Sequence, residues 1–325
     1  MKRIAVLDDY QGVVLGLPVW ERLKGRATVE AFRDTPADED ALVRRLTPFE
    51  ILVLIRERTR FPASLLRSLP RLKFLVMTGR NTGHVDIPAA TECGVMVTET
   101  GGSGAGPVEL TIGLMIAAVR RIAQEDRGLR AGQWQNSVGI ELSGKTLGIL
   151  GLGRIGSRIA EFGRFLGMRV LAWGPTLTAE RAAKSGAAFV PLETVFRESD
   201  VVSLHLRLSE QSRGLVTQGH LALMKPTAYL INTARGPLVD EAALVAALRE
   251  RRIAGAALDV YDVEPLPPDH PLLGLENALL TPHLGYVTEE AYQVFFSQAV
   301  ENIESYLDEQ LPPRVLNPEA LMRRR

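Results

Sequence analysis

Short apolar runs alternate with segments of helical spacing along the first hundred residues. The runs are rich in Val, Ile and Leu and lie between polar or glycine-containing stretches, which predicts buried strands. Strands are predicted at 3–7, 27–32, 51–55, 72–77 and 95–97, with helices at 18–24, 38–46, 62–68 and 86–92. Strands that alternate with helices in this way predict a parallel, doubly wound α/β sheet.

A second alternating series follows a glycine-rich run at 100–107, which predicts a hinge or linker. A long helix is predicted next, at 108–130. Strands are then predicted at 147–150, 169–173, 201–206, 228–233, 255–260 and 278–281, with helices at 155–166, 180–185, 219–224 and 241–252. Six strands with helices between them match a complete Rossmann domain.

The last predicted element is a long helix that begins after Thr288, a residue type that caps helices well, with Glu289 and Glu290 in the first turn. It ends at the prolines 312–313. Because the second series is already complete, we expect this helix to pack on the first. The predicted domains are therefore 1–100 plus 286–325, and 101–285.

Three glycines, Gly151, Gly153 and Gly156, follow the predicted strand 147–150 at the spacing G-x-G-x-x-G and open the helix at 155–166. The first permits a tight turn, the second lets a pyrophosphate approach the backbone, and the third lets the helix pack on the strand. The helix N-terminus then offers free N–H groups to phosphates. Strand before and helix after are the context that this motif requires, so the sequence predicts a dinucleotide site.

Residues 139–146, G-I-E-L-S-G-K-T, also match the P-loop pattern of nucleoside-triphosphate enzymes. A P-loop follows a buried strand and opens a helix. Here a polar stretch precedes the motif and a predicted strand follows it. We therefore expect an ordinary turn that leads into the strand at 147–150.

Composition narrows the class of protein. The chain has 325 residues, 46% of them hydrophobic and 23% charged, which is typical of a soluble protein of two domains. Lys plus Arg and Asp plus Glu both number 38, so the net charge is zero and argues against nucleic-acid or anionic-membrane partners. No apolar run is long enough for a signal peptide or a membrane span, so a cytoplasmic location is the default, and no metal site is predicted.

Three chemically suited residues follow neighbouring predicted strands: Arg235, Glu264 and His283. Ligands of open α/β sheets bind beyond the carboxyl ends of the strands. Taken singly, each residue has an ordinary structural explanation. Taken together, they supply a forked donor for a carboxylate, an imidazole for a proton and a carboxylate that orients the imidazole.

The segments around these residues resemble a known family. Residues 230–241 are L-I-N-T-A-R-G-P-L-V-D-E, residues 255–261 are G-A-A-L-D-V-Y, and residues 281–285 are T-P-H-L-G. They resemble the D-isomer-specific 2-hydroxyacid dehydrogenases, which include phosphoglycerate dehydrogenases and hydroxypyruvate-glyoxylate reductases. The resemblance implies two Rossmann-like doubly wound domains with a cleft between them. It also implies a flavodoxin-like substrate domain at 1–100 plus 286–325, an NAD(P)-binding domain at 101–285, and a homodimer built on the latter.

The resemblance also implies roles. Arg235 would bind the substrate carboxylate and polarise its carbonyl, His283 would be the general acid/base, and Glu264 would pair with His283. The reaction would be hydride transfer between NAD(P) and a D-2-hydroxy acid or 2-oxo acid. The expected cofactor-binding residues are Gly151, Gly153, Arg154, Ile155, Gly156, Gly174, Leu206, Thr233, Ala234, Asp259 and Gly285. Among them, Arg154 and Ile155 would lie over the pyrophosphate, Asp259 would hold the nicotinamide carboxamide, and Gly285 would lie near the nicotinamide.

The sequence departs from the family pattern at three points. Gly174 stands where an acidic residue often binds the adenosine ribose, so no carboxylate would repel a 2′-phosphate and both NAD and NADP remain open. The substrate loop 79–86 is altered, although backbone N–H groups of Arg80 and Asn81 could still hold a carboxylate. The loop at 205–209, which contains Leu206, lacks the usual proline.

Two other functions remain open at this stage. Relatives such as the C-terminal-binding protein corepressors use the fold as a nicotinamide-regulated binding scaffold, which the intact Arg235, Glu264 and His283 disfavour. A P-loop phosphotransferase fails on the context of its motif. Within the dehydrogenase hypothesis, glyoxylate, hydroxypyruvate, 3-phosphoglycerate and branched 2-oxo acids are all open as substrates.

Overall fold

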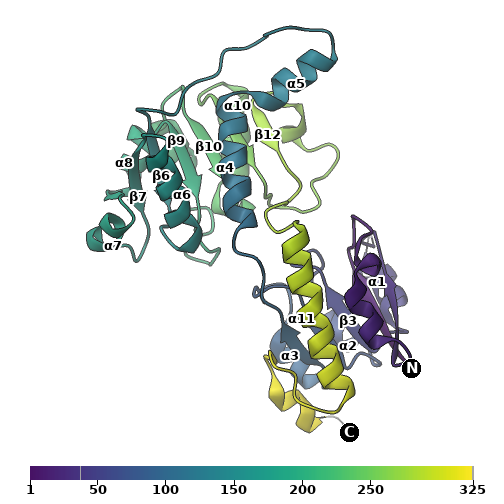
Figure 1. The fold of residues 1–325 in the computed structure, drawn as a ribbon. Helices are drawn as coiled ribbons and strands as arrows, with labels where there is room; N and C mark the ends of the chain where they lie inside the picture. Colours follow the sequence, from purple (N-terminus) through teal and green to yellow (C-terminus); the bar gives the residue numbers. More distant parts are fainter. Residues whose placement is uncertain (37, 324–325) are drawn as a thin grey trace. The chain divides into compact units, whose positions relative to one another are not determined.

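The computed structural model describes residues 1–36 and 38–323. The chain divides into two compact units, Met1–Ser103 with Thr288–Arg325, and Gly104–Val287. The boundary after residue 103 falls inside the glycine-rich run. Each unit is built on its own parallel sheet, with helices on the faces (Figure 1).

The first unit has a five-stranded parallel sheet in the order β2-β1-β3-β4-β5. Its strands are β1 (Lys2–Leu7), β2 (Ala27–Ala31), β3 (Ile51–Leu54), β4 (Phe74–Met77) and β5 (Met96–Glu99). Its helices before residue 103 are η1 (Val14–Gly16), η2 (Pro18–Leu23), α1 (Glu39–Leu46), α2 (Ala63–Arg67) and α3 (Ile87–Glu92). Every strand and helix predicted in this region is present, although the segment at 18–23 is a 3-10 helix.

The C-terminal segment belongs to the first unit. Helix α11 (Glu289–Leu307) packs against η2 and β4, and the ring of Tyr306 stacks on Phe74 with centroids 4.5 Å apart. Asn317, just before η5 (Pro318–Arg323), is buried. Its side chain donates to Thr91 Oγ1 and the Val95 carbonyl and accepts from the Val97 N–H. The segment at Asn317 is thus fixed to β5 and its neighbouring residues by buried hydrogen bonds.

The second unit has a seven-stranded parallel sheet in the order β12-β11-β10-β9-β6-β7-β8. The direction of strand order reverses between β6 and β9, as in a Rossmann domain. Its strands are β6 (Thr146–Leu150), β7 (Arg169–Trp173), β8 (Ala188–Phe189), β9 (Val201–Leu204), β10 (Tyr229–Asn232), β11 (Gly255–Leu258) and β12 (Ala278–Leu280). Its helices are α4 (Gly106–Val119), α5 (Ile122–Arg130), α6 (Arg154–Phe165), α7 (Ala179–Lys184), α8 (Leu192–Glu198), α9 (Gln218–Leu223), η3 (Gly236–Leu238), α10 (Glu241–Arg249) and η4 (Pro271–Gly274).

Apolar side chains fill both faces of this sheet. Residues of α4 and α6 form one buried cluster with β6 and β7, and residues of α8, α9 and α10 form another with β9 and β10. Burial on both faces explains why the strands are short, continuous apolar runs rather than alternating ones.

The structure corrects three details of the predicted elements. The single helix at 108–130 is two helices, because the chain turns at Arg121, which has a left-handed φ of 56°. Close to this turn, the Val119 carbonyl accepts a hydrogen bond from the N–H of Ile140, a residue distant in sequence. The prediction missed β8, a pair of exposed residues, and α8. The helix predicted at 241–252 ends at Arg249.

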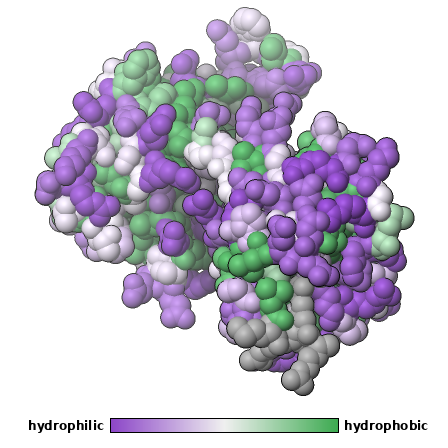
Figure 2. All heavy atoms as spheres, turned by 60° about the horizontal axis from the view of Figure 1, so that its bottom comes forward, coloured by the Kyte–Doolittle hydropathy of each residue, from purple (hydrophilic) through white to green (hydrophobic). Residues whose placement is uncertain are grey.

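Hydrophilic side chains cover most of the face shown in Figure 2, with smaller hydrophobic areas between them. Among the residues that the structure describes, no helix combines the length and the apolar character needed to cross a bilayer.

Candidate active site

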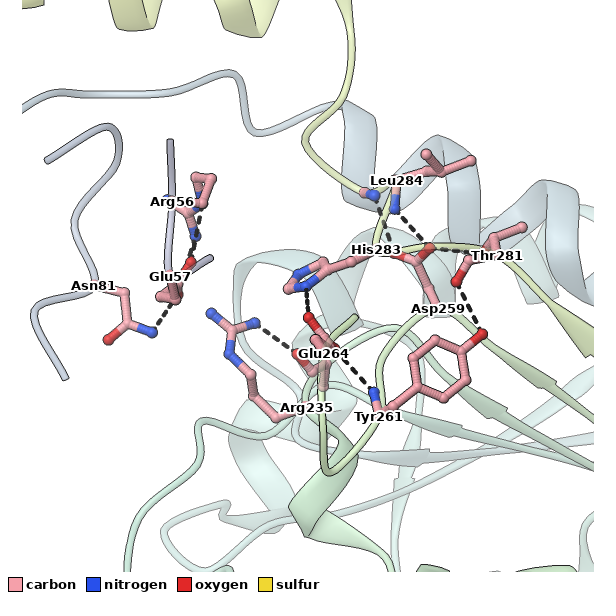
Figure 3. Close-up of polar contacts among 12 residues, drawn as sticks. Arg56, Glu57, Asn81, Arg235, Asp259, Tyr261, Glu264, Thr281, His283 and Leu284 are labelled. Carbon is pink, nitrogen blue, oxygen red and sulfur yellow. Dashed lines mark hydrogen bonds and ion pairs between the residues drawn. The ribbon is translucent and has the colours of Figure 1, made fainter. Parts of the chain in front are cut away.

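Arg235, Glu264 and His283 follow the adjacent strands β10, β11 and β12, at the carboxyl edge of the sheet of the second unit (Figure 3). His283 Nδ1 lies 2.6 Å from Glu264 Oε2, and the His283 side chain is 20% exposed. Because an ionised carboxylate only accepts, Nδ1–H is the donor and Nε2 is left without a proton in the neutral ring. Nε2 makes no hydrogen bond within the described part of the chain, so it is the nitrogen that can exchange a proton.

A buried tyrosine holds Glu264 and the residues before His283 together. The Tyr261 N–H donates to Glu264 Oε1 at 2.9 Å. Its hydroxyl lies 3.0 Å from the Thr281 carbonyl and 3.2 Å from the Leu258 carbonyl, and donates to them. Burial raises the pKa of the Tyr261 phenol, so the hydroxyl stays protonated and remains a donor. Tyr261 therefore links the loop of Glu264 to the end of β12.

Asp259 braces the segment that carries His283. Its Oδ1 accepts from Thr281 Oγ1 at 2.6 Å and from the Leu284 N–H at 2.7 Å, and its Oδ2 accepts from the Gly285 N–H at 3.0 Å. Burial raises the pKa of this carboxyl, while the three hydrogen bonds oppose the shift. His283 lies inside the braced segment with a left-handed φ of 53°. Such a backbone persists only where its surroundings over-determine it.

Arg235 is carried by a loop that packs directly on the loop of Glu264. The buried Asn232 closes its base, since Oδ1 accepts from Ala234 N–H and Nδ2 donates to the Arg235 carbonyl. Arg235 Nη1 donates to the Ala234 carbonyl at 2.6 Å. At Gly236, a Cβ would overlap the backbone of Tyr261 and lie 2.6 Å from Asp262 N. The two loops therefore approach so closely that only glycine fits.

The three glycines form a cradle at the end of β6. Gly151 has a φ of 98°, and a Cβ there would lie 2.7 Å from the His205 carbonyl oxygen and 3.0 Å from Leu206 Cδ2. A Cβ at Gly156 would overlap the Gly151 carbonyl. Helix α6 can therefore approach the turn at Gly151 only because residue 156 has no side chain. At Gly153, by contrast, a Cβ would meet nothing within 4 Å. The cradle is thus tight at its base and open at Gly153.

The open side of the cradle is the N-terminus of α6. Gly153 caps this helix without a side-chain hydrogen bond, and Arg154 and Ile155 are its first residues. Their backbone N–H groups have no partner in the preceding turn of the helix, which is the arrangement that binds phosphate. The Arg154 guanidinium lies near Gly104, since a Cβ there would be 3.4 Å from Arg154 Cζ. These residues fit the pyrophosphate of a dinucleotide.

The remaining cofactor candidates lie at the same edge. Gly174 follows β7 directly, and the Thr233 hydroxyl shares a hydrogen bond of 2.7 Å with Thr111 of α4. A Cβ at Gly285 would lie 3.4 Å from Asp259 Oδ2. The carboxyl ends of β6, β7, β9, β10, β11 and β12 therefore carry all the residues predicted for the cofactor. The segment 139–146 leads into strand β6 rather than a helix, which excludes a P-loop.

The predicted substrate residues Arg80 and Asn81 lie in the first unit, after β4. The Asn81 side chain is already engaged, since Nδ2 donates to Glu57 and Oδ1 accepts from Gly83 N–H. Arg80 is mostly exposed, with Nε 3.9 Å from Glu99. In the same loop, His84 is 7% exposed, and neither ring nitrogen makes a hydrogen bond of normal geometry among the described residues. Desolvation lowers the pKa of His84 to about 4, against the opposing effect of Glu57.

Comparison with known proteins shows which family this chain belongs to. The family model described as D-isomer specific 2-hydroxyacid dehydrogenase, NAD binding domain, matches residues 112–285. A glyoxylate reductase of Aeropyrum pernix is 40% identical over 272 residues, which cover 81% of each chain. A D-3-phosphoglycerate dehydrogenase of Archaeoglobus fulgidus is 39% identical over 260 residues, 79% of this chain but 49% of the relative. A solved structure of a phosphoglycerate oxidoreductase from Vibrio cholerae superposes with a TM-score of 0.91 at 43% identity, covering 95% of this chain and all of the other.

The protein is therefore an oxidoreductase with a dinucleotide-binding domain. More narrowly, the chain belongs to the D-isomer-specific 2-hydroxyacid dehydrogenase family. This confirms the family and the fold class of two parallel α/β units predicted from the sequence.

Sequence reasoning missed the residues that hold the site in place. The quoted motifs contain Asn232, Tyr261 and Thr281, but the motifs alone assign no role to these residues. Their partners are backbone groups and carboxylates brought together by the fold, so spacing alone could not identify them. The only sequence feature that points to His84 is its place as a histidine in the altered substrate loop 79–86.

We predict that Gly236→Ala lowers kcat/KM for a 2-oxo acid by about tenfold or more, because the new Cβ must push the Tyr261–Asp262 backbone away and misplace Glu264. The melting temperature should fall as well, since overpacking costs about 1–3 kcal/mol. Gly274→Ala is the matched control, because a Cβ there meets nothing within 4 Å. Equal kinetics for the two variants would contradict the coupling of the two loops.

A second prediction concerns pH. His84 has a folded pKa of about 4 against 6.5 for a free imidazole, so the unfolded chain binds this proton first as the pH falls. As the pH falls from about 6.5 to 4, His84 therefore lowers the free energy of unfolding, by roughly 3 kcal/mol at most. His84→Gln should remove that share of the pH dependence. Urea unfolding can be followed through Trp20 of the first unit, in a background in which Trp134 and Trp173 are replaced. Identical pH dependence with and without the imidazole would refute the prediction.

Proposed function

We propose that the second unit catalyses reversible hydride transfer between NAD(P) and a D-2-hydroxy acid, with His283 as the acid/base and Arg235 as the carboxylate clamp. The observation that carries this proposal is the 2.6 Å bond from His283 Nδ1 to Glu264. It leaves Nε2 as the proton-exchanging atom at the edge where Arg235 also lies. Bound nicotinamide would supply or accept the hydride.

In the reducing direction, His283 Nε2 gives its proton to the 2-oxo oxygen as the carbonyl carbon gains the hydride. Arg235 binds the substrate carboxylate with its guanidinium fork and stabilises the charge that develops on the carbonyl oxygen. Glu264 accepts from Nδ1 in both the neutral ring and the imidazolium, so it orients the ring throughout. In the oxidising direction, Nε2 takes the hydroxyl proton instead.

The cofactor would lie along the carboxyl edge of the second sheet. The backbone N–H groups of Arg154 and Ile155 would hold the pyrophosphate over Gly153. Asp259 and Gly285 would lie beside the nicotinamide, with Asp259 also bracing the His283 segment. We assign the second unit to the cofactor and the first, through the loop of Arg80 and Asn81, to the substrate. The cofactor is NAD or NADP.

The names of the relatives suggest which substrates to test first. The archaeal relatives are called glyoxylate reductase and D-3-phosphoglycerate dehydrogenase. We propose that the substrate is a small 2-oxo acid. The first compounds to test are glyoxylate, hydroxypyruvate, and 3-phosphoglycerate with the 2-oxo acid formed by its oxidation.

We predict that His283→Gln lowers kcat/KM by about 10²–10⁴, the usual contribution of a general acid/base. Glu264→Gln should lower kcat/KM less, because the proton-exchanging atom remains and only the carboxylate that orients its ring is lost. Turnover is measured as the change in NADH absorbance with each 2-oxo acid. Unchanged NADH binding by calorimetry controls for folding, and near wild-type turnover by His283→Gln would exclude the acid/base role.

We further propose that the chain forms a homodimer through the segment 122–138. Four large apolar side chains of this segment each leave more than half of their surface exposed, and Trp134 is 76% exposed: Ile122, Leu129, Trp134 and Val138. A gathering of exposed apolar side chains on one segment is typical of a protein–protein contact. A second copy is the occupant favoured here, because homo-oligomers most often form by such self-complementary patches.

The prediction for this interface is that Trp134→Ser with Val138→Ser halves the mass measured by light scattering, to that of a 35.6 kDa chain. Phe165→Ser is the matched control, because Phe165 is 83% exposed but lies on α6 outside this segment. A monomeric wild-type chain, or a double variant that stays dimeric, would reject the proposed interface.

A further inference from the structure

The turn after β7 lies beside the glycine cradle. Gly151 N–H donates to the Trp173 carbonyl at 2.8 Å, and a Cβ on Gly174 would lie 3.9 Å from Gly151 Cα. The chain then turns from Gly174 to Leu177, whose N–H donates back to the Gly174 carbonyl at 3.1 Å. In a Rossmann domain this position faces the adenosine ribose, where an acidic residue selects NAD and a nearby arginine accommodates the 2′-phosphate of NADP.

Nothing in the backbone forces a glycine at position 174. Its φ lies outside the left-handed range, and the nearest atom to a Cβ would be Leu177 Cβ at 3.4 Å, an ordinary contact. A side chain could therefore begin at this position, yet the chain has no carboxylate there. The site lacks the negative charge that would repel a 2′-phosphate.

Arg181 brings a positive charge to the same turn. It lies in the first turn of α7, where its N–H donates to Oγ1 of the capping Thr178. Its side chain folds back so that Nη1 donates to the Thr176 carbonyl at 2.9 Å, across the turn. The guanidinium is thereby held over the residues that follow β7.

No carboxylate neutralises this guanidinium within 4 Å among the described residues. The adjacent Glu180 is paired instead with Lys184, at 2.9 Å. The bond to Thr176 uses one of the five N–H groups of the guanidinium, so the fork that binds phosphate oxygens is still available.

We propose that Arg181 binds the 2′-phosphate of NADP, so that this chain binds NADP more tightly than NAD. The inference rests on the proposed function for the position of the cofactor, and it concerns only the adenosine end, far from the transferred hydride. Because the turn is exposed, the contribution of Arg181 should weaken as salt concentration rises.

The test uses adenosine fragments rather than turnover. Isothermal calorimetry compares 2′,5′-ADP with 5′-ADP, which differ only in the 2′-phosphate. We expect wild type to favour 2′,5′-ADP by about tenfold or more, as for one added hydrogen-bonded charge pair. Arg181→Ala should abolish that preference and leave the affinity for 5′-ADP unchanged.

Two further variants sharpen the result. Lys184→Ala removes a positive charge from the same helix and should keep the preference. Gly174→Asp should reverse it in favour of 5′-ADP. The proposal is overturned if wild type does not prefer 2′,5′-ADP, or if Arg181→Ala retains the preference. Turnover with a 2-oxo acid is scored separately: its failure would remove the proposed reaction, whereas the fragment affinities alone decide the role of Arg181.

Discussion

The parallel pairing of β10, β11 and β12 is the constraint on which the active site depends. In the register of these strands, Asn232 lies opposite Leu258, and Leu258 lies opposite Leu280. Arg235 and His283 each follow three residues after their strand, and Glu264 follows six after its own. Because hydrogen bonds between parallel strands fix where each strand ends, they bring three residues distant in sequence to one edge of the sheet. A slip in register would separate them and turn every side chain of the strand to the other face.

Register alone leaves side chains free, and the buried polar bonds of Asp259 and Tyr261 remove that freedom. Asp259 joins the end of β11 to Thr281, Leu284 and Gly285 on both sides of His283, while Tyr261 joins the same strand end to Glu264. Both residues are almost fully buried. Their polar atoms are satisfied, so they orient Glu264 and the segment of His283 without the cost of an unpaired buried charge. The contact at Gly236 extends this rigidity to Arg235.

Local patterning was sufficient for much of this structure. The apolar runs marked all five strands of the first unit and six of the seven in the second, because most of these strands are buried on both faces and are therefore continuous apolar runs. Local patterning failed at β8, whose two residues are exposed, and at Arg121, where the helix breaks beside a hydrogen bond from the Ile140 N–H to the Val119 carbonyl. For the candidate site, spacing and motif predicted Arg235, Glu264 and His283, and the structure brings these three residues to one edge of the sheet. The sequence pattern could not show that Asn232 and Tyr261 hold the loops of Arg235 and Glu264 in place, since the partners of these two residues are set by tertiary packing.

The two ends of the cofactor site differ in how much the fold restrains them. Near His283, substitution of Asp259 or Tyr261 would break buried hydrogen bonds, and a Cβ at Gly236 would be forced into backbone, so geometry and stability are coupled at these three positions. At the turn after β7, Gly174 is buried but a Cβ there would make only ordinary contacts, and the exposed Arg181 is held by one carbonyl. Exposed turns tolerate substitution at little cost in stability. Under the proposed role of Arg181, charge at this turn would set the choice between NAD and NADP, while the edge that carries His283 keeps its geometry.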